Sequence, residues 1–405
     1  MEGSFGVGVE GPLARYAPGY GAYLAELGYR PRSVVVQLRL VAHLSRWLEE
    51  RGLEPSALAA EAVEEFLRAR RERYVDLIGA RALGPLLGYL RGLGVVPELR
   101  PSADSPVERL LVDYREYLVR ERGLMAGSVD GHERVARLFL AGLVVPLEES
   151  LRELDAGEVT GFVVAKCRSG RLGAGAGKNL TAGLRSLLRF LHVAGWAPAG
   201  LAQAVPSVAG WRLGSLPRAL EPAQVARLLS SCDRSTPLGR RDFAIVTLLS
   251  RLGLRACEVA RLGLDDIDWR AGELTVRGKG STVERLPLPH DVGEALVSYL
   301  RDGRPVSSGL REVFLSARAP LKSLSSAAVT AVVRHACDRA GLERVGAHRL
   351  RHTVATELLR AGVPLAQIAP ILRHASVSTT AIYAKVDREA LRSLARPWPL
   401  AGGAA

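Results

Sequence analysis

One helical pattern occurs twice in the first half of the chain, and this repetition constrains the fold more than any other feature. Between residues 20 and 51, apolar side chains recur every three or four positions, as on the buried face of an amphipathic helix. Gly28 and Pro31 interrupt the pattern. Further helices are predicted at residues 61–73 and 78–94, the second followed by a proline.

The repetition is visible in the residues themselves. Tyr23-Leu24 matches Tyr117-Leu118, and the run LLGYL at 86–90 matches LLRFL at 187–191. A glycine and then a proline follow each run at the same distance. Residues 12–99 and 106–199 are therefore predicted to be two copies of one helical bundle. Two copies are too few for a solenoid and indicate separate modules.

Two polar segments that contain proline divide the chain, at residues 97–106 and 205–217. After the second, short strands are predicted at 272–276 and 283–288, around a Gly-Lys-Gly turn typical of a hairpin. Helices are predicted to begin at Glu221-Pro222 and to span 241–252, 290–301, 324–340, 348–361, 365–373 and 377–395. We thus expect a mainly α protein with an N-terminal bundle (1–104), a second bundle (105–204) and a linker (205–218). A mostly helical domain with a small antiparallel sheet (219–405) follows.

The composition indicates a polyanionic partner. The chain has 405 residues with 55 Lys and Arg against 42 Asp and Glu, a formal net charge of +13. Nucleic acid is the first candidate partner. The alternative explanation for the many arginines is the base composition of the genome. Four cysteines without Cys-x-x-Cys spacing argue against a disulfide framework or a zinc ribbon. With no apolar run of about 18 residues and no signal-peptide pattern, we expect a cytoplasmic, nucleoid-associated protein without membrane contact.

Two clusters of the C-terminal half contain cations in unusual positions. Arg255 follows a nearly uncharged helix and a Gly turn, and Glu258, three residues on, can hold its guanidinium. A surface ion pair is the alternative interpretation. Lys279 lies between two glycines at the predicted hairpin tip, where it can approach a phosphate, although a solvated turn is equally compatible with this pattern.

A third cluster contains histidines, an arginine and a tyrosine. His348 and Arg351 face one direction from a helix start, and His374 and Tyr383 follow. His348 and His352 have zinc-pair spacing, but an Arg replaces the Glu of the metalloprotease motif, and neighbouring arginines would repel a dication. No Gly-x-Ser-x-Gly elbow supports a serine hydrolase. We therefore expect no metal.

A glycine-rich run at residues 173–179 resembles a phosphate-binding Walker A loop. Leu172 and Asn179 stand where that motif has Gly and Ser or Thr. We interpret the run as a surface loop before the last helix of the second bundle, and we expect no use of ATP.

Taken together, the clusters suit attack by a tyrosine on a phosphodiester. Tyr383 is the plausible nucleophile in a site surrounded by cations. The two arginines would neutralise the nonbridging oxygens as charge builds in the transition state. A Lys or His would protonate the 5′-oxygen leaving group, and a His would accept the tyrosine proton.

The order and spacing of these residues resemble the tyrosine recombinase (phage integrase) family. Its pattern is Gly-Leu-Arg-x-x-Glu, a Lys in a β-hairpin, His-x-x-Arg, a His or Trp, and a Tyr nine residues later. The counterparts here are Arg255 with Glu258, Lys279, His348, Arg351, His374 and Tyr383. The match covers residues 219–395, and residues 105–201 resemble the family's core-binding domain. Together these would form a clamp around DNA.

The resemblance implies a metal- and ATP-independent, cofactor-free enzyme that cleaves and rejoins double-stranded DNA at specific recombination sites. The reaction would proceed through a 3′-phosphotyrosine and a Holliday junction, for integration, excision or transposition of a mobile element. It also implies a homotetramer on DNA, alone or with sister recombinases. Residues 387–394, with Leu391 and Leu394 as anchors, would be the C-terminal exchange segment.

The chain departs from the family pattern at three places. Arg373 replaces the usual Gly, Thr282 stands where a second Lys is common, and the bundle at 1–104 is additional. An extra bundle is similar to the longer recombinases of mobile elements, and we expect it to make accessory contacts with DNA or another protomer. Candidate DNA contacts of the second bundle are Arg134, Arg137, Lys178, Arg185 and Arg189.

Two other functions stay open at this point. A type IB topoisomerase uses a similar site as a monomer and relaxes DNA. A decayed recombinase would bind DNA without cleaving it, although the six catalytic positions are all present here.

Overall fold

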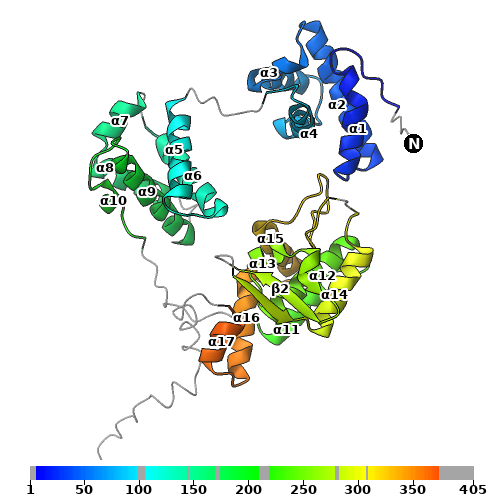
Figure 1. Ribbon diagram of the computed structural model, residues 1–405, viewed down its shortest axis with the longest axis vertical. Coiled ribbons are helices and arrows are strands. Elements are labelled where there is room, and N and C mark those ends of the chain that lie inside the picture. Colours follow the sequence, from blue (N-terminus) through cyan, green and yellow to red (C-terminus); the bar gives the residue numbers. More distant parts are fainter. Residues whose placement is uncertain are drawn as a thin grey trace, which may run out of the picture. The chain divides into compact units, whose positions relative to one another are not determined.

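The chain is mainly helical with one small antiparallel sheet, which confirms the predicted fold class (Figure 1). The computed structural model describes residues 6–97, 105–143, 146–168, 174–208, 219–278, 282–306 and 309–373. The chain divides into two compact units, Pro97–Gly214 and the combination of Met1–Val96 with Ser215–Ala405. None of the described helices is long and apolar enough to span a bilayer. The domain boundaries given above stay a prediction.

Over residues 6–97, the N-terminal bundle has four α-helices around its own apolar core. They are α1 (Ala17–Glu26), α2 (Pro31–Glu50), α3 (Ala60–Arg71) and α4 (Ala80–Gly92), with 3₁₀ turns at Ala14–Tyr16 and Pro55–Ala57. The predicted break at 28–31 separates α1 from α2, where Pro31 occupies the first turn. Apolar positions spaced by three and four place Leu24, Leu44 and Leu48 fully in the core.

The second bundle has a separate core. Its helices are α5 (Pro106–Arg120), α6 (Ala126–Leu140), α7 (Leu147–Glu153), α8 (Ala156–Arg168), α9 (Ala174–Val193) and α10 (Leu201–Ala204). The interpretation of residues 173–179 as a loop was wrong, because α9 begins at Ala174. Small residues serve packing in this helix. At Gly183 an added Cβ would lie 2.9 Å from Cβ of Val135 on α6, so a bulkier residue there would separate the two helices.

The same aromatic contact marks corresponding positions of the two bundles. Tyr23 on α1 packs against Tyr89 on α4, with ring centroids 5.3 Å apart. Tyr117 on α5 packs against Phe190 on α9 at 5.4 Å. These four residues belong to the two sequence runs that repeat, so the repeated residues make equivalent contacts.

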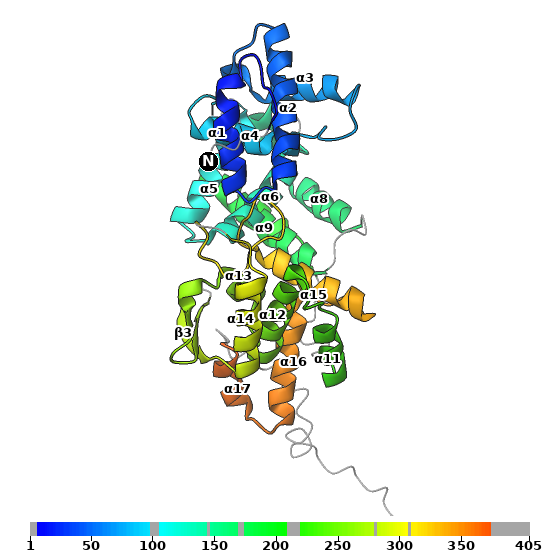
Figure 2. The ribbon, with the colours of Figure 1, turned by 90° about the vertical axis from the view of Figure 1, so that its right-hand side faces the viewer.

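The C-terminal part is built around a central helix. Its helices are α11 (Pro222–Ser230), α12 (Pro237–Leu252), α13 (Ala256–Arg261), α14 (His290–Asp302), α15 (Ser326–Ala340), α16 (Ala347–Arg360) and α17 (Leu365–Ile371). Helix α12 lies against α14, α15 and α16 (Figure 2). It begins four residues before the predicted start, because Thr236 caps its N-terminus with a side-chain oxygen and Pro237 occupies the first turn.

The sheet is a small antiparallel meander beside these helices. Strands β1 (Ile267–Asp268), β2 (Glu273–Arg277) and β3 (Val283–Pro287) follow in that order. The predicted hairpin is confirmed, with Leu274 opposite Leu286 and Val276 opposite Glu284. The two-residue β1 was not predicted, since it is too short to show an alternating pattern.

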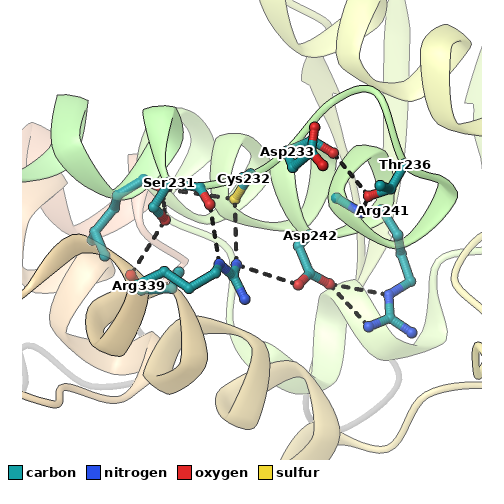
Figure 3. Close-up of polar contacts among 10 residues, drawn as sticks. Ser231, Cys232, Asp233, Thr236, Arg241, Asp242 and Arg339 are labelled. Carbon is teal, nitrogen blue, oxygen red and sulfur yellow. Dashed lines mark hydrogen bonds and ion pairs between the residues drawn. The ribbon is translucent and has the colours of Figure 1, made fainter.

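A buried carboxylate fastens α15 to α12 (Figure 3). Asp242 on α12 accepts hydrogen bonds from Arg241 at 2.9 Å and from Arg339 of α15 at 3.4 Å. The Nε of Arg339 also donates to the carbonyl of Ser231 at 3.0 Å, just after α11. Arg339 thus links α15 to α12 and to the end of α11. These contacts hold α12 in place, and the candidate site follows the end of α12.

Candidate active site

A left-handed turn at the end of α12 positions the first predicted cation. Gly253 has φ +58° and ends the helix. A Cβ there would lie 2.9 Å from Cδ2 of Leu372 and 3.5 Å from Cγ1 of Val354, so both the angle and the space require glycine. Helix α13 starts three residues later, at Ala256, and Arg255 is the residue that precedes it.

Glu258 holds Arg255 from the first turn of α13. The Nη1 of Arg255 donates to Oε1 of Glu258 at 2.6 Å, and the backbone N–H of Arg255 donates to Oε2 at 2.8 Å. The Glu258 side chain is fully buried, whereas that of Arg255 is 29% exposed. The contact is therefore not a surface ion pair, although part of the Arg255 side chain stays accessible to solvent.

Glu258 is ionised despite its burial. Burial favours the neutral acid, but the backbone N–H of Arg255 and the charges of Arg373 and Arg255 favour the carboxylate more strongly. Their combined effect lowers the pKa of Glu258 below its ordinary value. The carboxylate therefore keeps its negative charge at neutral pH.

Arg351 and His348 project from the start of α16. Arg351 is 1% exposed, and its Nη1 donates to the carbonyl of Gly253 at 2.6 Å. His348 is open to solvent on one side. Packing on its other side, and then the charges of Arg351 and Arg255, lower the pKa of His348. The structure thus brings Arg255, Arg351 and His348 to the turn after α12.

His352, the second member of the zinc-like pair, packs against His348. The ring centroids are 4.5 Å apart in an edge-to-face arrangement, which is a packing geometry. Burial, then His348 and two arginines, lower the pKa of His352 to about 4. Within the described ranges, no group of three or more His, Cys, Asp or Glu side chains is arranged to hold a metal ion.

Arg373 belongs to the same cluster, although the sequence did not mark it as a site residue. Its Nη2 donates to Oε2 of Glu258 at 3.2 Å, and its carbonyl accepts from Nη2 of Arg255 at 2.6 Å. The signal that could have found it is the departure from Gly in the family motif. Lys279, His374, Tyr383 and the segment 387–394 lie outside the described residues.

The predicted DNA contacts of the second bundle differ in availability. Arg137 is bound by Glu108 and Glu133, and Nη2 of Arg185 donates to the carbonyl of Val205 at 2.8 Å. These two arginines help to hold the bundle together. Arg134 on α6 and Arg189 on α9 are exposed, while Lys178 is half-buried.

Comparisons with known proteins place the chain in a family. Residues 218–390 match the model of the phage integrase family. The "Putative integrase/recombinase y4rA" of Sinorhizobium fredii is 41% identical over 395 residues, which cover 96% of this chain and 95% of the relative. The chain belongs to the tyrosine recombinase (phage integrase) family.

One further relative and one solved structure match a smaller part of the chain. Tyrosine recombinase XerD of Listeria monocytogenes is 30% identical over 296 residues, covering 70% of this chain and 96% of XerD. Among solved structures, a lambda integrase tetramer bound to a Holliday junction has a TM-score of 0.51 at 18% identity. It covers 78% of this chain and 88% of its own, and the likeness shows a shared fold.

Proposed function

We propose that this tyrosine recombinase is a site-specific enzyme that cleaves and rejoins DNA through a 3′-phosphotyrosine and a Holliday junction. The observation that carries the proposal is the convergence of Arg255 and Arg351 on the turn after α12. Both charges act on His348. A cationic site of this kind favours a phosphodiester whose negative charge grows in the transition state.

In the proposed cleavage step, residues of the chain supply the nucleophile, the charge stabilisers, the base and the acid. The hydroxyl oxygen of Tyr383 attacks phosphorus, the bond from phosphorus to the 5′-oxygen breaks, and a 3′-phosphotyrosine forms. Arg255 and Arg351 neutralise the nonbridging oxygens. The lowered pKa leaves His348 neutral at pH 7, the form that can accept the tyrosine proton. Lys279 or His374 gives a proton to the leaving 5′-oxygen. No metal, ATP or other cofactor enters this step.

Rejoining reverses this step on another strand. A 5′-hydroxyl attacks the phosphotyrosine, and the ester energy is conserved. Two duplexes are exchanged this way when four protomers act together, and we propose a homotetramer on DNA, alone or with sister recombinases. A lambda integrase with the same fold was solved as a tetramer on a Holliday junction, which supports this assembly. Residues 387–394 would connect neighbouring protomers.

The second bundle is proposed to form one arm of a DNA clamp. Arg134 and Arg189 are its best candidates for phosphate contacts, because both are exposed. Arg137 and Arg185 are already bound to groups of the protein. They contribute to DNA binding mainly by holding the bundle in shape.

The N-terminal bundle is proposed to contact DNA or another protomer outside the core site. A groove of about 360 Å³ between α2 and the end of α3 is lined by Arg46, Arg73, Trp47 and Tyr74, among others. In full-length protein, replacing Arg46 and Arg73 by Ala should weaken binding to long DNA. The salt slope should fall by about 0.9 for each phosphate that the variant no longer neutralises. Unchanged affinity and synapsis would contradict this role.

A covalent trap and a relaxation assay separate recombination from its alternatives. A DNA site can be selected from a random pool of duplexes by binding to the protein. A nicked duplex that contains this selected site should yield a covalent protein–DNA adduct. A silent DNA-binding scaffold would yield none. A topoisomerase would relax supercoiled plasmid that lacks the selected site, whereas a recombinase should require that site. Inverted repeats that flank the gene would identify a mobile element.

A further inference from the structure

Arg373 has a backbone conformation that favours glycine. It follows α17 with φ +55°, in the left-handed region where a Cβ is unfavourable. The family motif that this stretch resembles has Gly at the position. An arginine is therefore retained here against its backbone preference, and interactions of its side chain must compensate.

The side chain of Arg373 forms a buried ion pair with Glu258. Nη2 lies 3.2 Å from Oε2, and the two side chains are 4% and 0% exposed. The same carboxylate accepts two hydrogen bonds from Arg255. One buried carboxylate therefore holds both guanidinium groups.

The backbone of Arg373 binds Arg255 directly. The carbonyl of Arg373 accepts a hydrogen bond from Nη2 of Arg255 at 2.6 Å, while Nη1 of Arg255 donates to Oε1 of Glu258 at 2.6 Å. Both terminal nitrogens of Arg255 thus have fixed partners, one on α13 and one after α17. A guanidinium with its orientation already fixed loses less entropy when it binds a phosphate.

The charges of Arg255, Glu258 and Arg373 also bear on how strongly this cluster attracts a phosphate. Arg255 and Glu258 alone would form a neutral pair, which would attract a phosphate weakly. With Arg373 the cluster carries one net positive charge. The arginine after α17 therefore offsets the carboxylate that holds Arg255.

We propose that Arg373 is a positioning residue of the cleavage site, which fixes the orientation of Arg255 and prevents Glu258 from cancelling its charge. The inference rests on the proposed function, because the scissile phosphate is the group that Arg255 neutralises. It predicts that a glycine at this position, although better suited to the backbone, impairs cleavage.

The test compares two substrates in single-turnover cleavage by full-length protein at saturating DNA. One is the selected nicked duplex, and the other has a methylphosphonate at the scissile position, which lacks the nonbridging negative charge. Arg373→Gly should lose at least about tenfold in cleavage rate on the phosphate and clearly less on the methylphosphonate. Arg373→Lys, which keeps the charge, should recover part of the rate. Arg360→Ala, an exposed arginine of α16, is the control.

The outcomes distinguish the possible failures. A wild-type protein that forms no covalent adduct would contradict the proposed function itself. A Gly variant as fast as wild type, or one slowed equally on both substrates, would overturn the positioning role. Arg255→Ala and Arg373→Gly should be strongly non-additive when combined, and additive losses would also overturn it. If the Gly variant does not fold, the two-substrate comparison with Arg373→Lys decides in the same way.

Discussion

Replacing Glu258 by Gln removes a buried charge while keeping the shape of the side chain. Arg255 and Arg373 would then lack the carboxylate to which both donate. The Arg373 side chain is 4% exposed and cannot recover hydration, whereas that of Arg255 is 29% exposed and can. Removing one partner of a buried pair costs about 3–5 kcal/mol, and the partial exposure of Arg255 places the expected loss at about 3 kcal/mol.

The loss should depend on pH in a defined direction. The pKa of Glu258 is lowered in the folded protein, so its ionised form stabilises the fold fully above the unfolded value of about 4.3. This stabilisation is lost as the pH falls from there through the lower pKa of the folded state. The stability difference between wild type and the Gln variant should therefore be largest at neutral pH and shrink below about pH 4.

Guanidinium unfolding of the full-length protein, followed by far-UV circular dichroism from pH 7 to acid, measures this difference. Glu357→Gln is the matched control, because that carboxylate is exposed on α16. Cleavage should also fall by about 100-fold or more, since a misplaced phosphate stabiliser costs about 3–4 kcal/mol. A Gln variant within about 0.5 kcal/mol of wild type at pH 7, or a difference that does not change with pH, would refute the reasoning.

Three further predictions concern the turn, the hairpin and the second bundle. Gly253→Ala introduces a Cβ 2.9 Å from Leu372 and a left-handed penalty of about 1–2 kcal/mol, so the thermal midpoint should fall; an unchanged midpoint would contradict the geometry. Lys279→Ala should slow cleavage of a normal 5′-oxygen far more than that of a 5′-bridging phosphorothiolate, whose thiolate leaves without a proton. Equal slowing would exclude Lys279 as the acid. Arg134→Ala with Arg189→Ala should lower the salt slope of DNA binding by about 0.9 for each phosphate left without its arginine, and an unchanged slope would remove them from the interface.

Features set by local sequence were predictable. The three-four spacing of apolar residues predicted α1 and α2, and two short strands around a Gly-Lys-Gly turn predicted the hairpin of β2 and β3. The start of α12 was missed because the apolar pattern begins only after its first turn. The capping signal, Thr236-Pro237, was present in the sequence. Residues 174–179 were misassigned because glycines usually mark loops, yet here they form the first turns of α9.

The candidate site divides in the same way between local and long-range contacts. Glu258 could be matched to Arg255 because they are three residues apart on one helical turn. The contact of Arg373 with Glu258 spans 115 residues and depends on how α17 packs against α16, which brings the end of α17 to the turn after α12. Neither periodicity nor spacing encodes such a contact. Only the replacement of a motif glycine by arginine indicated that this position is unusual.

In the proposed mechanism, Tyr383 attacks DNA in a site assembled from Arg255, Arg351 and His348. The most direct measurement is covalent trapping on the selected nicked duplex by wild type and by Tyr383→Phe, at protein concentrations where both bind the DNA fully. We expect the wild-type protein to form an adduct that migrates with the labelled strand after denaturation. The Phe variant should bind DNA with wild-type affinity and form no adduct. An adduct at wild-type yield from the Phe variant would contradict the account.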